Sequence, residues 1–171
     1  MNTTATVAED SDENVETAIL AGDVVLFGKK DGQLYVLVIR RRWEPFIGHL
    51  AVPGGCVGIG EDTEDAARRE LGEETGLSAD QLIYVGVYAK PGRDPRGRVV
   101  SFAYTALLDH LPDPTAGDDA AVAEWVLVAE VLAAGTQLAF DHRQIITDAM
   151  RKLVSNDAMG KVIGAAYRVA M

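Results

Sequence analysis

The hydrophobic pattern predicts a β-hairpin early in the chain. Apolar and β-branched residues fill positions 18–27 and 34–39, and the segment Lys29-Lys30-Asp31-Gly32-Gln33 between them is rich in turn-forming residues. A short apolar piece follows at 50–52. We expect Pro53-Gly54-Gly55 after it to form a sharp turn.

Residues 62–75 carry the clearest helical pattern. Asp62 suits the N-cap position, because its short side chain can accept hydrogen bonds from the first free backbone N–H groups. Ala66 and Leu71 are spaced to share one apolar face, and Gly76 stands where helices commonly end in a left-handed conformation. We therefore predict a helix with well-defined ends.

Later segments alternate between strand and helix patterns. Strands are predicted at 82–88, 99–108 and 124–128, a brief helix at 129–134 and a longer helix at 141–154. The order is two strands, a helix, three strands and two helices. This order favours an α/β fold in which a mixed sheet has helices on both faces.

Length and composition fit a single domain. The 171 residues suffice for one core, and 48% of them are hydrophobic. Residues 1–16 contain several acids and no basic residue, which predicts a disordered acidic N-terminal tail. We assign residues 17–171 to one domain.

The acidic balance and the single cysteine limit the expected partners and compartment. A formal net charge of -10 disfavours binding to nucleic acid or to an anionic membrane, because both require clustered basic residues. The sequence contains no apolar run of the roughly 20 residues that span a bilayer. Cys56 stands alone and can form no intramolecular disulfide, which is typical of a reducing compartment. We expect a cytoplasmic protein.

Three glutamates stand close together near the end of the predicted helix. Glu70, Glu73 and Glu74 occupy positions i, i+3 and i+4, so their side chains share one helix face. They repel one another, and they lie at the helix end where the macrodipole already places negative charge. A divalent cation would relieve both penalties, and magnesium prefers such oxygen ligands. A solvated acidic face paired with Arg68 and Arg69 is the alternative for the glutamates alone.

The residues around these glutamates complete a specific motif. Gly55 is followed after five residues by Glu61, after seven more by Arg69-Glu70-Leu71, and then by Glu73-Glu74 and Gly76-Leu77. This spacing is that of the Nudix box, and the chain after its tail resembles the Nudix hydrolase family. The resemblance implies a Nudix-type α/β/α sandwich with a catalytic loop-helix-loop. It also implies hydrolysis of the diphosphate linkage of a nucleoside diphosphate derivative with Mg²⁺ or Mn²⁺.

The resemblance assigns roles by position. Glu70, Glu73 and Glu74 match the family's metal-binding glutamates, and Glu73 and Glu74 are assigned to catalysis as well. Arg69 matches the arginine that orients the acidic cluster through Glu61, and we count Arg69 among the catalytic residues.

Two regions of the sequence supply candidates for the general base. In relatives it is a glutamate of the box or an acid from a later loop, and Glu74, Asp118 and Asp119 are the candidates here. We select Asp119 as a further catalytic residue, and Glu124 could play the same part. An ordinary turn at 117–119 is the alternative interpretation.

A basic loop predicts the substrate-binding residues. Arg93 and Arg96 lie within residues 91–98, and arginine presents a planar fork of donors that suits phosphate. The alternative is a solvated loop. This loop, with 117–120 and 140–142, resembles the ADP-ribose pyrophosphatase branch of the family and the related sensor domains of NAD-metabolism repressors.

Other predicted contacts come from the loop and turn before the helix. Gly55, in the turn that leads to the helix, and the aromatic Phe46 complete the predicted substrate-binding set. Trp43 and Tyr88 are further candidates for stacking on a nucleobase, although packing against the sheet is the commoner use of such residues. His142 follows Asp141 at a helix start, where we favour a local structural role over catalysis, with Asp141 as the cap.

The favoured function is hydrolysis of ADP-ribose to AMP and ribose 5-phosphate, with a small-molecule nucleotide as substrate. The resemblance also allows a homodimer, because ADP-ribose-cleaving relatives are often dimers. One alternative is pyrophosphohydrolysis of nucleoside triphosphates, including oxidised ones. Another, of a different class, is a sensor that binds ADP-ribose and controls a partner. The repressors carry a DNA-binding winged helix after the Nudix part, and only a short segment follows Leu153 here, so we favour catalysis.

Overall fold

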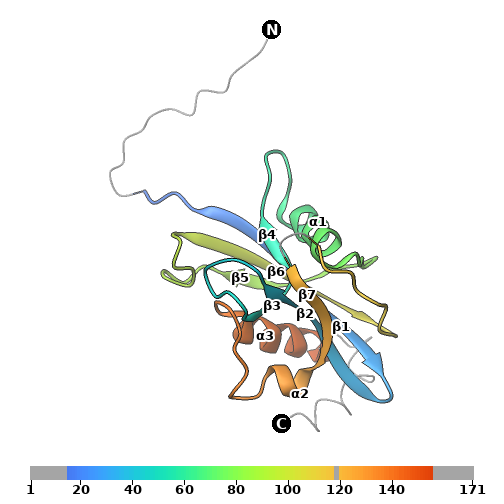
Figure 1. The fold of residues 1–171 in the computed structure, drawn as a ribbon. Coiled ribbons are helices and arrows are strands. Elements are labelled where there is room, and N and C mark those ends of the chain that lie inside the picture. Colours follow the sequence, from blue (N-terminus) through green and yellow to red (C-terminus); the bar gives the residue numbers. More distant parts are fainter. Residues whose placement is uncertain (1–14, 118–119, 156–171) are drawn as a thin grey trace.

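The computed structural model describes residues 15–117 and 120–155. Within these ranges the chain forms seven strands and three helices (Figure 1). The strands are β1 (Ile19–Lys30), β2 (Gln33–Arg41), β3 (Leu50–Ala51), β4 (Gly54–Cys56), β5 (Ile83–Tyr88), β6 (Val99–Leu108) and β7 (Ala120–Leu127). The helices are α1 (Thr63–Thr75), α2 (Val128–Val131) and α3 (His142–Ser155).

All seven described strands belong to one mixed sheet. Five of them follow the order β3-β2-β1-β6-β5, while β4 pairs with β1 and β7 pairs with β2. Strand β1 runs parallel to β6, which places Ala21 beside Ser101, and the other pairings are antiparallel. The predicted mixed sheet is confirmed.

Strand β1 is paired on both edges. Strand β6 follows one edge of β1 from Ile19 to Gly28. On the other edge, β4 pairs with the first part of β1 and β2 with its last part, from Phe27 onward. Strands β4 and β2 therefore pair with successive parts of the same edge of β1.

Helices cover both faces of this sheet (Figure 1). Leu71 of α1 shares a buried cluster with Leu26 of β1, and Ile145 of α3 shares another with Phe27. Successive residues of a strand point to opposite faces, so the apolar run from Val24 to Phe27 in β1 supplies both cores. The structure is the predicted α/β/α sandwich.

Helix α1 begins and ends as the sequence predicts. The Asp62 carboxylate accepts hydrogen bonds from the backbone N–H groups of Glu64 and Asp65, at 2.8 and 2.9 Å. Gly76 has a φ of 68°, and its N–H donates to the carbonyl of Gly72. Both caps satisfy backbone groups that the helix leaves free.

Three segments differ from the predicted pattern. The turn expected at Gly54 and Gly55 is wrong, because both residues belong to β4 and pair with β1. The strand expected at 124–128 begins at Ala120, and the brief helix expected at 129–134 is the single turn α2. The hydrogen bonds that define β4 come from β1, more than 30 residues earlier, so local glycine content misled the prediction.

Most of the predicted tail, residues 1–14, lies outside the described residues. Its last residue, Glu16, is described and forms an ion pair with Arg98, with 3.1 Å between Glu16 Oε2 and Arg98 Nε. Of the helices in the described part of the chain, none combines the length and the apolar character that crossing a membrane would require.

Candidate active site

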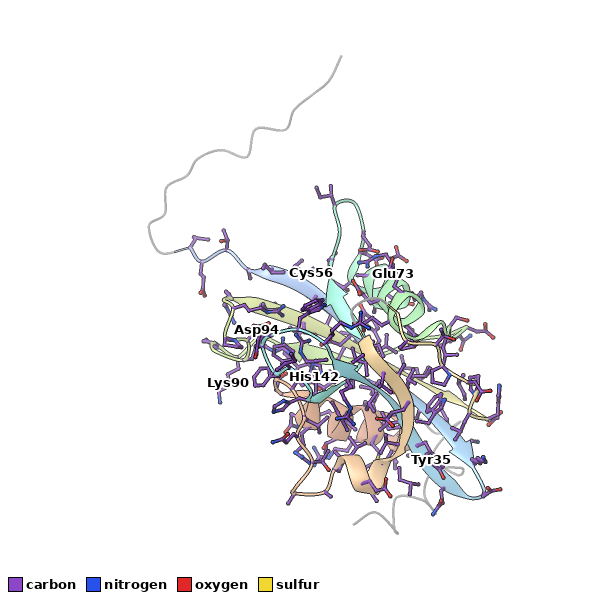
Figure 2. All side chains as sticks on the ribbon, viewed as in Figure 1. Tyr35, Cys56, Glu73, Lys90, Asp94 and His142 are labelled. Carbon is purple, nitrogen blue, oxygen red and sulfur yellow. The ribbon has the colours of Figure 1, made fainter. Side chains whose placement is uncertain are left out.

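A cavity of about 390 Å³ lies beside Glu70 and Glu74 of α1. It is lined by residues of β1, β2 and β4, by the loop after β5 and by the start of α3. Figure 2 shows three of its lining residues, Cys56, Asp94 and His142, which come from β4, that loop and α3. The charged residues that line the cavity are Arg41, Arg42, Arg93, Arg96, Asp23, Glu44, Glu70, Glu74 and Asp94.

Two glycines of β4 allow acidic side chains to approach this strand closely. A Cβ atom on Gly55 would lie 2.3 Å from Glu70 Oε1, and one on Gly54 would lie 2.1 Å from Asp23 Oδ1. The N–H of Gly54 donates to Glu74 Oε2 at 2.9 Å. No larger residue fits either place without displacing a carboxylate. Gly55 was predicted to contact substrate, and it does line the cavity.

Arg69 holds the acidic cluster together, as the sequence predicts. Its Nε and Nη2 donate to the two carboxylate oxygens of Glu61, at 2.9 and 3.0 Å. Its Nη1 donates to Glu70 Oε1 at 2.6 Å and to Glu73 Oε2 at 3.0 Å. These bonds to Glu61, with one from the N–H of Gly58, hold the pKa of the Glu61 carboxyl below its ordinary value.

The three box glutamates have the right chemistry for a divalent cation, although their carboxylates do not converge. The described residues include no group of three or more His, Cys, Asp or Glu side chains arranged to hold a metal ion. Glu70 and Glu73 instead share Arg69 Nη1, and Glu74 turns to Gly54. Carboxylate oxygens suit magnesium, and a cation here would share Glu70 and Glu73 with Arg69.

A later segment contacts the end of α1. The N–H of Thr115 donates to the carbonyl of Thr75 at 2.8 Å, and that of Gly117 donates to the carbonyl of Glu74 at 3.1 Å. Asp119, predicted to be catalytic, and Asp118 lie outside the described residues, so their roles stay predictions. Glu124 forms an ion pair with Arg40 at 3.3 Å.

The basic loop is not simply solvated, because its first arginine is buried. The Arg93 side chain is 5% exposed, and its Nε and Nη2 donate to the two carboxylate oxygens of Asp141 at 2.9 and 2.5 Å. The Arg96 side chain is 57% exposed and forms a similar pair with buried Asp94. Both arginines line the cavity. Asp141, expected to cap α3, uses its carboxylate to hold Arg93.

An aromatic ring joins this loop to β2. The guanidinium carbon of Arg41 lies 5.0 Å from the ring centre of Phe140, and that of Arg96 lies 5.6 Å from it. Phe46 packs edge-on against Phe140, with ring centres 4.9 Å apart. Phe140 lines the cavity, whereas Phe46, predicted to bind substrate, does not line it and packs against Phe140. Arg41 and Arg96 therefore both lie within cation–π distance of the Phe140 ring beside the cavity.

Trp43 and Tyr88, the other aromatic candidates, differ in position. Trp43 is exposed and lines the cavity. The Tyr88 hydroxyl donates to Asp148 Oδ2 at 3.1 Å, and its ring packs against the core cluster beneath α3. Of these two, Trp43 is therefore the one placed to stack on a ligand in this cavity.

The floor of the cavity contains polar residues to which the sequence analysis gave no role in binding. Asp23 of β1 is buried and accepts a hydrogen bond on Oδ2 from the hydroxyl of Ser101 in β6. His142 is buried at the start of α3, and its Nδ1 accepts a hydrogen bond from the N–H of Val52 at 3.0 Å. One signal was present, because Asp23 is the one charged residue in the stretch from Ile19 to Gly28 of β1.

The fold and the glutamate helix agree with a comparison against known families. The NUDIX domain model matches residues 19–149, and the chain belongs to the Nudix family. The Arg69-centred cluster described above lies within the matched residues.

Individual relatives are linked to ADP-ribose by name. The ADP-ribose pyrophosphatase of Methanocaldococcus jannaschii is 44% identical over 117 residues, which are 68% of this chain and 66% of that protein. The ADPR responsive transcriptional repressor NtrR of Acinetobacter baylyi is 30% identical over 151 residues, 87% of this chain and 60% of that protein. The chain thus spans less than two thirds of the length of each of these curated relatives.

A solved structure extends the likeness over nearly the whole chain. The NUDIX domain of Shewanella oneidensis NrtR, in complex with ADP ribose, is 30% identical and superposes with a TM-score of 0.77. The match covers 90% of this chain and 99% of that domain.

Proposed function

We propose that the chain hydrolyses ADP-ribose to AMP and ribose 5-phosphate with Mg²⁺ or Mn²⁺ held by Glu70, Glu73 and Glu74. The observation that carries the proposal is one cavity that faces both the glutamate helix and four arginines. A diphosphate needs positive groups to neutralise its oxygens, and its hydrolysis needs an activated water. The names of the relatives support ADP-ribose as the diphosphate.

The box residues divide the chemistry among them in this proposal. A bound divalent cation would polarise the attacking water and neutralise phosphate oxygens. Arg69 fixes the positions of Glu61, Glu70 and Glu73, and Glu70 and Glu73 would turn partly from Arg69 toward a bound cation. Glu74, buried and held by the N–H of Gly54, and Asp119 are the candidates that receive the proton of the water.

Arg93 and Arg96 bind the diphosphate with the part of each guanidinium that faces away from its aspartate. Each uses Nε and Nη2 for the carboxylate, and neither Nη1 has a hydrogen-bond partner in residues 15–117 and 120–155. A guanidinium whose fork is fixed in this way loses little freedom when it binds phosphate. Gly55 lets the substrate approach the backbone of β4, and Phe46 acts through Phe140.

The remaining assignments belong to the same proposal. In this proposal the substrate is a small-molecule nucleotide and the protein acts in the cytoplasm. We further propose that it forms a homodimer and has neither nucleic acid nor membrane as a partner. A second function, binding of ADP-ribose without cleavage, is favoured by the match to the repressor NtrR. Release of AMP distinguishes the two functions.

The test is the specificity constant, kcat/KM, for ADP-ribose and for dGTP with saturating magnesium. We expect ADP-ribose to have the higher value, because the loop of Arg93 and Arg96 forms part of the cavity wall. If dGTP is cleaved at least as efficiently, the triphosphate function replaces this one.

A further inference from the structure

Asp23 occupies a position where an apolar residue would be expected. It lies on the α3 face of β1, in line with the fully buried Val25 and Phe27, and it is 6% exposed. Burial of a carboxylate is costly unless it is well paired, and an apolar residue of similar size would pack there without that cost. The metal and diphosphate chemistry proposed above makes no use of this acid.

The contacts of Asp23 leave one oxygen for the cavity. Its Oδ2 accepts the hydroxyl hydrogen of Ser101, while Oδ1 has no hydrogen-bond partner in the described part of the chain. Within that same part, every fully enclosed side-chain oxygen and nitrogen has a partner. Oδ1 is therefore not fully enclosed, and the open space beside Asp23 is the cavity that it lines.

His142 presents the complementary group to the same cavity. It is 4% exposed, and its Nδ1 accepts the N–H of Val52, so Nδ1 carries the lone pair and Nε2 carries the proton of the neutral ring. Burial lowers the pKa of His142, an effect that the Asp23 carboxylate opposes, and the ring is neutral at pH 7. Nε2 has no acceptor among the described residues. Because every fully enclosed side-chain nitrogen among them has a partner, Nε2 is not fully enclosed and is open to the cavity that His142 lines.

We propose that Asp23 Oδ1 and His142 Nε2 together bind a ribose hydroxyl of the substrate. A hydroxyl can donate to the carboxylate and accept from the imidazole at once, which few other small groups can do. The two side chains form no hydrogen bond with each other, although the charge of Asp23 acts on the ring. Both line the same cavity, and the proposed subsite places one hydroxyl between them.

The position of the subsite suits a sugar next to the diphosphate. Gly54 contacts Asp23 on one side and donates to Glu74 on the other, so the subsite adjoins the glutamate helix. Both riboses of ADP-ribose are attached directly to the diphosphate. The inference rests on the proposed function, because it names the part of that substrate which lies at the floor of the cavity.

The test compares Asp23→Asn and His142→Asn with the parent in direct binding. Asn at 23 keeps an oxygen for Ser101 and replaces the other acceptor with a donor, whereas Asn at 142 keeps an acceptor for Val52 and removes Nε2–H. The ligands are ADP-ribose, ADP, which lacks the terminal ribose, and an ADP-ribose whose adenosine has no ribose hydroxyls. Calorimetry in excess chelator excludes turnover. Where chelator abolishes binding, inhibition or KM in magnesium gives the same comparison.

We expect each variant to bind ADP-ribose at least about tenfold more weakly than the parent. The ligand that lacks the recognised hydroxyl should bind the parent and both variants alike. If parent and variants bind ADP with equal affinity, the subsite belongs to the terminal ribose. If they bind the compound without adenosine ribose hydroxyls with equal affinity, the subsite belongs to the adenosine ribose. Asp109→Asn is the matched control, because Asp109 is exposed, pairs with Lys29 and does not line the cavity. Its affinity should equal the parent's.

Two results would overturn the subsite and leave the proposed function intact. One is that both variants bind ADP-ribose within twofold of the parent. The other is that both lose the same factor for all three ligands, as a purely structural role would require. If Asp23→Asn fails to melt cooperatively, His142→Asn decides alone. If the parent neither binds nor cleaves ADP-ribose, the substrate assignment fails and the subsite fails with it.

Discussion

Arg93 and Arg96 lie three residues apart and form similar ion pairs, yet their partners differ in distance along the chain. Arg96 pairs with Asp94, two residues away, whereas Arg93 pairs with Asp141, 48 residues away. The pair of Arg93 therefore ties the loop to the start of α3. The sequence marks both residues as phosphate ligands and gives no sign that one of them also holds two elements together.

Removal of Arg93 should cost stability, and removal of Arg96 should cost less. Arg93→Ala leaves Asp141 without its partner and opens a space in the interior, so we expect the free energy of unfolding to fall by about 2 kcal/mol. For Arg96 we expect a loss of about 1 kcal/mol, because its side chain is exposed and buried Asp94 keeps the hydrogen bond from the backbone N–H of residue 96. Urea denaturation of the two variants at pH 7 measures both values. Equal losses would show that the Arg93–Asp141 pair does not secure the loop.

Glu61 gives the acidic cluster a signature in the pH dependence of stability. Its pKa is lowered in the folded state by Arg69, so its contribution is present above the unfolded pKa and is lost as the pH falls through the folded pKa. Glu61→Gln should therefore be less stable than the parent by a constant amount above about pH 5. The two unfolding free energies should converge as the pH falls below about 4. A difference that persists unchanged to pH 3 would contradict this.

At the scale of elements, the sequence predicts well those segments that carry their own stabilising contacts. Helix α1 has its N-cap, apolar face and glycine end within 15 residues, and its predicted bounds are confirmed at both ends. Strand β4 is three residues long, two of them glycine, and depends on Asp23 and its neighbours for pairing. A local pattern cannot contain that information.

The contact between α1 and the segment before β7 depends on a glycine. A Cβ atom on Gly117 would lie 1.9 Å from the carbonyl oxygen of Glu73, which is backbone and cannot move aside cheaply. Gly117→Ala should displace this segment from the end of α1 and lower the free energy of unfolding by about 2 kcal/mol. It should also lower turnover, because Glu73 and Glu74 form that end of the helix.

Gly135→Ala is the control for this prediction. A Cβ atom there would meet no atom within 4 Å, so its unfolding free energy should stay within about 0.5 kcal/mol of the parent's. Thermal melting and turnover of both variants give the comparison. If Gly117→Ala melts at the same temperature as Gly135→Ala and keeps full activity, the close approach of Gly117 to the end of α1 is not needed.

At the scale of the whole molecule, the two halves of the site differ in how far the sequence reveals them. The glutamates follow one another on a single helix, so their common face could be predicted. Asp23, Ser101 and His142 come together only because β1 pairs with β6 in parallel and α3 begins beneath that pair. No spacing rule joins residues that are 78 and 119 positions apart.

The same domain occurs in relatives with different names, one a pyrophosphatase and one a repressor. What separates catalysis from sensing in this account is whether the glutamate helix works as a metal site. The hypothesis of catalysis therefore depends on Glu73, whose side chain is 61% exposed and whose carboxylate pairs with Arg69.

The most direct measurement is the release of AMP from ADP-ribose, in magnesium, by the parent, by Glu73→Gln and by Glu64→Gln. Glu64 lies in the first turn of the same helix and pairs with Arg68, so its variant controls for the loss of one glutamate from α1. We expect Glu64→Gln to match the parent and Glu73→Gln to be at least about a hundredfold slower, with no parent activity in excess chelator. Full activity of Glu73→Gln, or of the parent in chelator, would contradict the account.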